Sequence, residues 1–457
     1  MLNFLDTNFE RGDTLGVEVV MRKFLSLAVM CSLAFPAMAF AQPESPKEAA
    51  DDLDKEFGKE TPTEPEAEGA TAEPPKEAIM AMPESPKTAA DDIGVEEPAE
   101  GAPWKDGLSW MVMASAFYRI GGYTDDGVVA GTYNDIGYPY TNYNGFGLNF
   151  AGGDLMYTGE KFAIRLDLRF GEGAALLSPI APIKQGYVSW MPSDKVSFDF
   201  GFFDTVFGGE VADEWNNANY TRGALYFLRQ PFNHMGIRSA FELADNVGMT
   251  VMVTNGGVLG GTPIDNNETP TIGWQLAFSD ANENFGFFFG GQHGAGGDND
   301  NKNWENFFDW VLTANAGIFS LIANGDYQII PTGPLNDPTT TPPTVVSGKA
   351  FAYGHSLQLI FDASDQWSIG LRGEHLSGNT QYRDFAASGD TGLATGTITL
   401  RYKPVQYLVL SLEGRGEWNT REIYFSRSSL VGAAATGDPN KKQNYAAILG
   451  FTAYIGN

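Results

Sequence analysis

Apolar and polar side chains alternate along extended segments from residue 108 onward, and this alternation constrains the fold more than any other feature. The clearest segment runs from Lys161 to Phe170. Its apolar side chains are Phe162, Ile164, Leu166, Leu168 and Phe170, and the residues between them are Ala163, Arg165, Asp167 and Arg169. Because successive side chains of a strand point to opposite faces, this segment has an apolar face and a charged face. The recurrence of the pattern predicts a transmembrane β-barrel with lipid outside and a wet lumen inside.

Sixteen segments carry this pattern. The predicted strands are Leu108–Ile120, Phe146–Tyr157, Lys161–Phe170, Ile183–Met191, Val196–Phe202, Ile237–Leu243, Met249–Thr254, Thr271–Ser279, Phe285–Gln292, Phe307–Ala316, Ile318–Ile330, Phe351–Phe361, Trp367–Leu376, Gly392–Tyr402, Tyr407–Trp418 and Tyr445–Ile455. Single-chain outer-membrane barrels have an even number of strands. We therefore predict an all-β fold, a transmembrane antiparallel β-barrel of about 16 strands, within bounds of roughly 14 to 18.

Short and long connections alternate between these strands. The short ones are Ser279–Asn284, Ala363–Gln366 and Lys403–Gln406, and the long ones are Gly294–Glu305, Pro331–Gly348 and Asn419–Gln443. Outer-membrane barrels have short periplasmic turns and long outer loops. The asymmetry therefore predicts which rim of the barrel faces the periplasm.

Three segments precede the predicted barrel, which we place at residues 103–457. Residues 1–20 carry acids where an export signal is basic, so we expect a mis-annotated extension with Met21 as the true start. Residues 21–41 have a basic start, an apolar run and small residues at its end, which predicts a cleaved signal peptide. Residues 42–102 are rich in Pro, Glu and Ala, and an acidic motif at Pro43–Leu53 recurs at Pro83–Ile93. Such a composition cannot offset its ordering entropy, which predicts a disordered, acidic, periplasmic linker.

Charge and composition exclude several classes of function. The net charge is −28, which argues against nucleic acid as a partner, because phosphate binding needs positive charge. Cys31 is the only cysteine and lies in the predicted signal peptide. The four histidines His234, His293, His355 and His375 have no metal-ligand spacing. We therefore predict no metal site, no cofactor and no disulfide.

The stretch from Val196 to Gly257 resembles the putative beta-barrel porin-2 (OmpL-like) family of bacterial outer-membrane proteins. The resemblance rests on G-F-F-D-T-x-x-G-G-E at Gly201–Glu210, N-x-N-Y-T-R at Asn217–Arg222, P-F-N-H-M-G-I-R at Pro231–Arg238 and an x-N-G-G strand end at Thr254–Gly257. It covers about residues 140 to 260. It implies a porin in the outer membrane of a Gram-negative bacterium.

The connection from Asp204 to Phe232 is longer than a hairpin needs, and acids precede bases along it. We predict that it folds inward to narrow the pore, because the interior of a barrel of this size is too wide for wall side chains to fill. The predicted constriction consists of Glu210, Asp213 and Glu214 opposite Arg222, Arg229 and Arg238. The predicted lumen wall contains Arg165, Asp167, Arg169, Glu242, Arg372, Glu374, Arg401, Glu413, Arg415 and Glu417. The alternative, charges on a solvated outer loop, stays open at this point.

These features predict a passive, water-filled channel for small hydrophilic solutes or ions. The alternative is a structural barrel that anchors the envelope through the acidic linker, or a sleeve around a partner protein. An enzyme is not expected, because the adjacent pair His355 and Ser356 would point to opposite faces of a strand. The mixed charges count against a conduit for hydrophobic solutes. A homotrimer and a cell-wall or periplasmic partner of the linker stay open as partners, beside the outer-membrane lipid itself.

Overall fold

The computed structural model describes residues 107–121, 145–258, 265, 267–282, 284–296, 301–337, 344–378, 391–420, 422, 424, 430–431, 434–435 and 441–456. The predicted extension, signal peptide and acidic linker at residues 1–102 lie outside the described residues.

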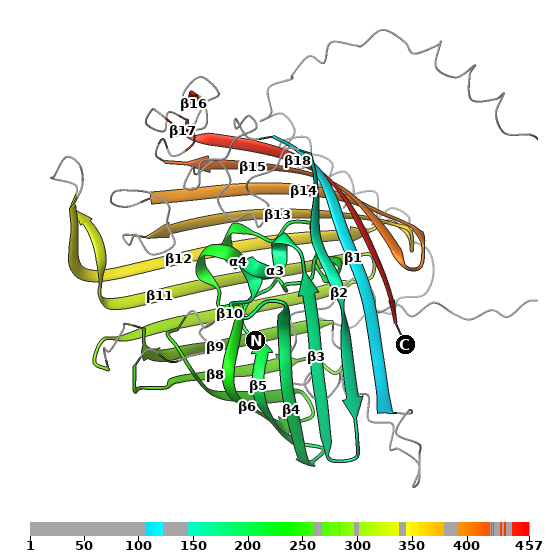
Figure 1. The fold of residues 1–457 in the computed structure, drawn as a ribbon, viewed down its shortest axis with the longest axis vertical. Helices are drawn as coiled ribbons and strands as arrows, with labels where there is room; N and C mark the ends of the chain where they lie inside the picture. Colours follow the sequence, from blue (N-terminus) through cyan, green and yellow to red (C-terminus); the bar gives the residue numbers. More distant parts are fainter. Residues whose placement is uncertain are drawn as a thin grey trace, which may run out of the picture. The chain divides into compact units, whose positions relative to one another are not determined.

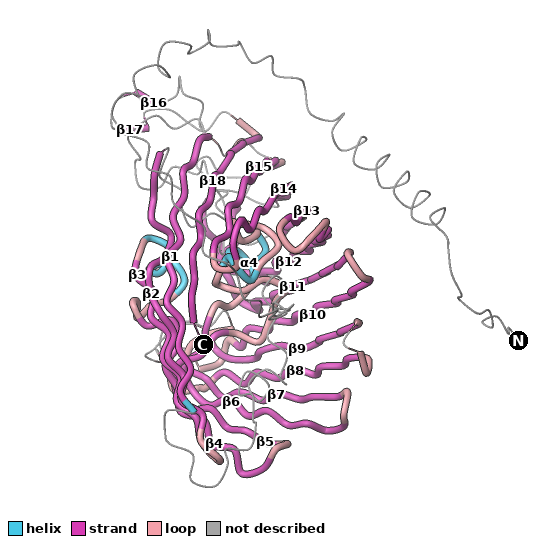
Figure 2. The backbone as a smooth tube through the Cα atoms, turned by 90° about the vertical axis from the view of Figure 1, so that its right-hand side faces the viewer, coloured by secondary structure: helices cyan, strands magenta, loops and turns pink. Residues whose placement is uncertain are grey.

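Sixteen antiparallel strands form a closed barrel, as the sequence predicts. Closure is made by β1, which pairs with β2 on one side and with β18 on the other. Figures 1 and 2 show each strand beside its sequence neighbour around the sheet. The barrel strands are β1 (Leu108–Gly121), β2 (Gly145–Thr158), β3 (Phe162–Phe170), β4 (Ile183–Ser193), β5 (Val196–Asp204), β6 (Asn233–Ala244), β7 (Val247–Thr254), β8 (Thr271–Ser279), β9 (Phe285–Ala295), β10 (Trp304–Ala316), β11 (Phe319–Asp337), β12 (Thr344–Asp362), β13 (Trp367–Gly378), β14 (Thr391–Val405), β15 (Leu408–Asn419) and β18 (Gln443–Gly456).

Burial alternates along the strands with the period of the sequence pattern. On β3, Ile164 is 47% exposed and Leu166 is 36% exposed, whereas Asp167 between the apolar residues is fully buried. The apolar face therefore points outward and the charged face points into the barrel. Aromatic rings lie on the outer face near the short turns, such as Trp367 stacked on Tyr402 with centroids 4.3 Å apart. Rings at this position are typical of a membrane interface.

The prediction of a long loop at Pro331–Gly348 is wrong. Strand β11 continues to Asp337, strand β12 begins at Thr344, and Pro334 lies opposite Ser347 in the ladder. A register shift between Ile330 and Gly333 separates this extension from the regular part of the ladder. Glycine and proline would interrupt a regular central strand, but they are tolerated at a bulge. The glycine and proline content of this segment therefore led to the wrong prediction of a loop.

Short elements lie between the barrel strands. Helix α3 (Glu172–Leu177) connects β3 to β4, and the two-residue strands β16 (Leu430–Val431) and β17 (Ala434–Ala435) form a separate hairpin. The connection from β5 to β6 at residues 205–232, here called the β5–β6 loop, contains the 3-10 helix η3 (Glu214–Asn216) and helix α4 (Ala224–Arg229). Among the described residues, none of the helices has the length and apolar character of a membrane span.

Candidate functional site

The β5–β6 loop contacts inward-facing side chains on opposite walls of the barrel. Near its start, the Gly208 N–H donates to Asp309 Oδ1 on β10 at 3.2 Å. Further along, the Glu214 carboxylate accepts hydrogen bonds from Asn149 Nδ2 on β2 at 2.9 Å and from Thr452 Oγ1 on β18 at 3.1 Å. Strands β2 and β18 flank β1, and β10 lies far from them in the barrel order. These contacts thus join the loop to opposite walls of the barrel.

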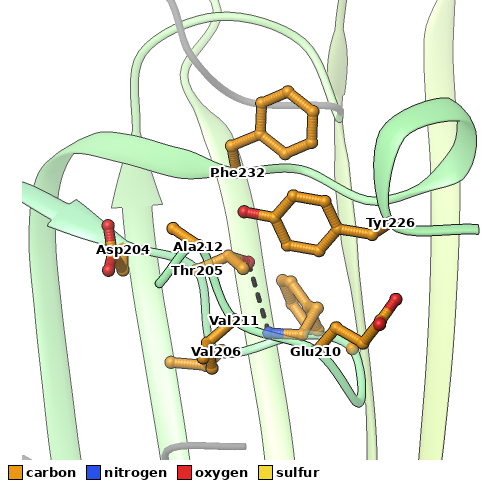
Figure 3. A pocket seen from close by; sticks show the side chains of 10 residues that line it. Asp204, Thr205, Val206, Glu210, Val211, Ala212, Tyr226 and Phe232 are labelled. Carbon is orange, nitrogen blue, oxygen red and sulfur yellow. Dashed lines mark hydrogen bonds between the residues drawn. The ribbon is translucent and has the colours of Figure 1, made fainter. Parts of the chain in front are cut away.

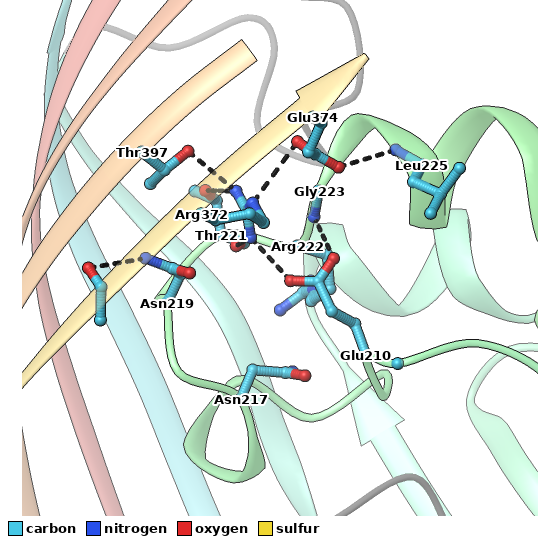
Figure 4. A network of polar contacts seen from close by, with 12 residues as sticks. Glu210, Asn217, Asn219, Thr221, Arg222, Gly223, Leu225, Arg372, Glu374 and Thr397 are labelled. Atoms are coloured by element: carbon cyan, nitrogen blue, oxygen red, sulfur yellow. Dashed lines mark hydrogen bonds and ion pairs between the residues drawn. The ribbon is translucent and has the colours of Figure 1, made fainter. Parts of the chain in front are cut away.

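The second half of the loop is held by carboxylates of the wall. Glu413 on β15 accepts from the Tyr220 N–H at 2.7 Å. Glu374 on β13 accepts from the N–H groups of Ala224 and Leu225, each at 3.0 Å. These two N–H groups begin α4 and have no partner within the helix, so the carboxylate satisfies donors that a helix start leaves open. Figure 4 shows this network between the loop and β13.

Arg372 lies at the centre of that network. Its Nη1 lies 2.6 Å from Glu210 Oε1 and also donates to the Thr221 carbonyl at 2.6 Å. Its Nε lies 3.4 Å from Glu374 Oε2. The second oxygen of Glu210 accepts from the Gly223 N–H at 2.6 Å. One guanidinium thus joins an acid of the loop to an acid of the wall, and all three side chains are buried.

Asp213 of the loop forms a second ionic anchor on the other side of the lumen. Its Oδ2 lies 3.0 Å from Arg169 Nη2 on β3 and 3.0 Å from Lys184 Nζ on β4. Burial alone would raise the pKa of the Asp213 carboxyl, but Arg169 and Lys184 outweigh burial and hold this pKa below its ordinary value. Asp213 is therefore ionised at neutral pH. By contrast, burial raises the pKa of Glu214, whose partner Arg222 is 3.7 Å away.

The lowered pKa of Asp213 predicts how the stability contributed by this anchor depends on pH. The pKa of Asp213 is lower in the folded protein than its ordinary value of 3.8. The ionised carboxylate therefore stabilises the folded state in full at pH values above 3.8, and this stabilisation is lost as the pH falls through the folded-state pKa. We expect Asp213→Asn to lower the free energy of unfolding by a constant amount from neutral pH down to about pH 4, and by less in stronger acid. Urea unfolding of both proteins in detergent at several pH values measures this difference. A difference that already disappears at mildly acidic pH would contradict the assignment.

The other residues of the predicted constriction have different partners. Arg222 lies over the Phe150 ring with 5.6 Å between guanidinium and centroid, and it pairs with Glu214. Arg238 on β6 pairs with Asp199 of the neighbouring strand at 2.8 Å. Arg229, on α4, acts electrostatically on Asp326 of β11. The acids Glu210 and Asp213 therefore pair mainly with Arg372, Arg169 and Lys184 of the wall, whereas we predicted that they face Arg222, Arg229 and Arg238.

The residues of the predicted lumen wall lie on the polar faces of their strands. Several form pairs two positions apart on one strand, namely Arg165 with Asp167 at 3.1 Å and Arg415 with Glu417 at 2.9 Å. Arg401 donates to the Glu214 carbonyl at 2.6 Å. Glu242 on β6 is half-buried. The wall is thus a series of paired charges of both signs.

Inward glycines give the loop room. A Cβ built at Gly370 on β13 would lie 2.5 Å from the Ala218 carbonyl oxygen, and one at Gly450 on β18 would lie 2.5 Å from the Tyr220 ring. Such distances do not occur for real Cβ atoms. The wall is therefore shaped to fit the loop at these positions.

Sequence reasoning missed Lys184, Asp309, Asn324 and Asp326. Asn324, Asp326 and Gln328 alternate along β11, which was a usable signal for inward side chains. Asp309 alternates with Phe307 and Val311, so the inward face of β10 does not look polar. Lys184 lies at the register shift between β3 and β4, which periodicity does not reveal.

A cavity of about 20 Å³ lies between the start of the loop and α4, with room for about one water molecule. Asp204, Thr205, Tyr226 and Phe232 are among its lining residues (Figure 3). The Tyr226 ring stacks on Phe232 with centroids 5.0 Å apart, and burial raises the pKa of the Tyr226 hydroxyl. The cavity is thus a packing gap inside the loop. Within the described ranges, no group of three or more His, Cys, Asp or Glu side chains is arranged to hold a metal ion.

Comparison with solved structures found outer-membrane proteins that are similar in fold. OmpT of Vibrio cholerae in its trimer form, an outer membrane protein, is similar with a TM-score of 0.50 and 13% identity over 76% of this chain and 99% of that one. The outer membrane channel DcaP of Acinetobacter baumannii gives a TM-score of 0.49 and 12% identity over 76% and 96%. An anion-selective porin from Comamonas acidovorans gives 0.49 and 9% over 76% and 99%. At these identities the likeness concerns the fold. The comparison with curated protein sequences gave no match.

A family model matches residues 112–446, which include almost the whole barrel and the β5–β6 loop. Its description is "Putative beta-barrel porin-2, OmpL-like". This agrees with the closed barrel of sixteen strands and supports a porin role and an outer-membrane location. The chain belongs to the putative beta-barrel porin-2, OmpL-like family.

Proposed function

We propose that this porin is a passive diffusion channel for small hydrophilic solutes or ions, and that the β5–β6 loop narrows its lumen. The supporting observation is the course of the loop, which bonds to Asp309 on one wall and to Asn149 and Thr452 on the other. Paired charges of both signs around it order water and penalise large apolar solutes.

The burial of side chains around the loop supports a narrow route. Arg222 in the loop is fully buried, and Arg372 on the wall is 2% exposed. Closer to the short turns, Arg165 is 17% exposed. Wide aqueous channels leave their lining accessible to water, so the lumen would be narrowest at the loop and wider on the side of the short turns.

Swelling of liposomes that contain the purified protein tests this proposal. We expect fast entry of the smallest neutral hydrophilic solutes and a steep decline with solute size, because the loop limits the cross-section. Protein-free liposomes are the control. Equal swelling rates for small and large sugars would contradict a narrowed lumen, and no swelling with any solute would contradict the channel.

We propose that the acidic linker is a periplasmic spacer that precedes the barrel. Pull-down of cell-wall material or of an envelope protein that depends on residues 42–102 would instead favour the tethering function.

A further inference from the structure

Two carboxyl groups lie side by side on the inward face of the barrel. Asp309 on β10 and Asp326 on β11 are direct cross-strand partners, and both are fully buried. Asn324 Nδ2 donates to Oδ1 of Asp309 at 2.8 Å and to Oδ1 of Asp326 at 3.2 Å. The amide therefore holds both acids in one orientation.

This arrangement favours one bound proton. An ionised carboxylate only accepts hydrogen bonds, whereas a protonated carboxyl group can donate to its cross-strand neighbour. No donor among the described residues reaches Oδ2 of Asp309 or of Asp326, which leaves these oxygens free to hold it. Two adjacent buried carboxyl groups cannot both ionise easily, and sharing one proton resolves the repulsion.

Few other charges face the pair. Arg229 of α4 acts on Asp326, so one guanidinium stands against two carboxyl groups. Glu305 lies four residues before Asp309 on the same face of β10. The neighbouring strands β9 and β12 contribute only Gly290 and Gly354 to the same row of the ladder. Within the described part of the chain, the pair thus lacks a second base to neutralise it.

The same pair holds the start of the β5–β6 loop. The Gly208 N–H donates to Asp309 Oδ1, and the Gly209 N–H donates to Asn324 Oδ1 at 3.1 Å. Arg229, near the end of the loop, acts on Asp326. The protonation state of the pair therefore affects interactions at both ends of the β5–β6 loop.

We propose that Asp309 and Asp326 form a proton-binding site, and that loss of their shared proton raises the conductance and the cation preference of the channel. The second half of this proposal, on conductance and cation preference, rests on the proposed channel function. Loss of the proton leaves two adjacent negative charges beside Gly208. The added negative charge attracts cations into the lumen, so the cation conductance and the cation preference rise together.

Infrared spectroscopy tests the site without any channel activity. In the folded full-length protein, we expect a carbonyl stretching band of a protonated carboxylic acid that shifts in D₂O. The band is lost in Asp309→Asn and in Asp326→Asn, because a single carboxyl group has no partner with which to share. Asp199→Asn is the matched control, since Asp199 is a buried strand carboxyl group that is ion-paired with Arg238. A band that persists in both pair variants overturns the site.

Planar-bilayer recordings across pH test the coupling. We expect wild-type conductance and cation preference to rise in one step with increasing pH, and we expect both pair variants to lack that step. If the step remains in both variants, or if the wild type has the infrared band without the step, the coupling is overturned. A protein that shows the band and conducts at no pH would instead contradict the proposed function, so the two failures are distinguishable.

Discussion

Replacing Gly370 by valine should raise the single-channel conductance several-fold. A Cβ at this position already overlaps the Ala218 carbonyl oxygen, and the larger valine side chain would prevent the loop from packing against β13. The loop should move away from β13, and the bonds from Arg401 to the Glu214 and Asn219 carbonyls should break. Planar-bilayer recordings of the folded variant measure the effect.

Gly373→Val is the matched control for this prediction. Gly373 lies on the same strand but on the outer face, and a Cβ built there meets no heavy atom within 4 Å. Its conductance should equal that of the wild type. Gly450→Val provides an independent test, because there the obstructed group is the Tyr220 ring. If Gly370→Val and Gly450→Val fold and conduct like the wild type, the loop does not limit the pore.

Replacing Arg372 by methionine should destabilise the barrel by about 3–5 kcal/mol, the cost of leaving buried charges without their partner. The substitution keeps most of the side-chain volume, but it leaves Glu210 and Glu374 without the guanidinium that pairs with both of them. Urea unfolding in detergent gives the loss of stability. Protease cleavage within residues 205–232 should become faster in the same variant, because Arg372 also holds the Thr221 carbonyl.

A compensated variant separates loss of charge balance from loss of packing. Adding Glu210→Gln and Glu374→Gln to Arg372→Met removes the uncompensated charges, and we expect most of the lost stability to return. If the triple variant is as unstable as the single one, the effect of Arg372 arises from its packing and neutral hydrogen bonds.

The sequence predicted the barrel because lipid imposes the same demand on every strand. All sixteen segments were recognisable, and Thr271–Ser279 was predicted with the observed bounds. Apart from the extension of β11 and β12, the main errors occur where the inner face meets protein and not water. β6 begins at Asn233, four residues before the predicted start, and there the His234 ring packs near Phe203 and Phe207. Apolar inward residues such as Phe307 mask the alternation for the same reason.

The site was less predictable than the barrel because its contacts join distant parts of the chain. The acids of the loop were visible in the sequence, but their partners were not. Glu210 and Arg372 are 162 positions apart, and Tyr220 and Glu413 are 193 apart. Composition indicates that such charges exist. Only the strand order, the register and the course of the loop decide which of them meet.

The conductance of the purified wild-type protein in a planar bilayer shows whether the barrel is an open channel. We expect discrete, ohmic openings of small conductance, with a weak cation preference in a salt gradient, because the barrel is wet, narrow and slightly acidic. A folded protein that inserts into the bilayer and shows no openings would contradict this expectation.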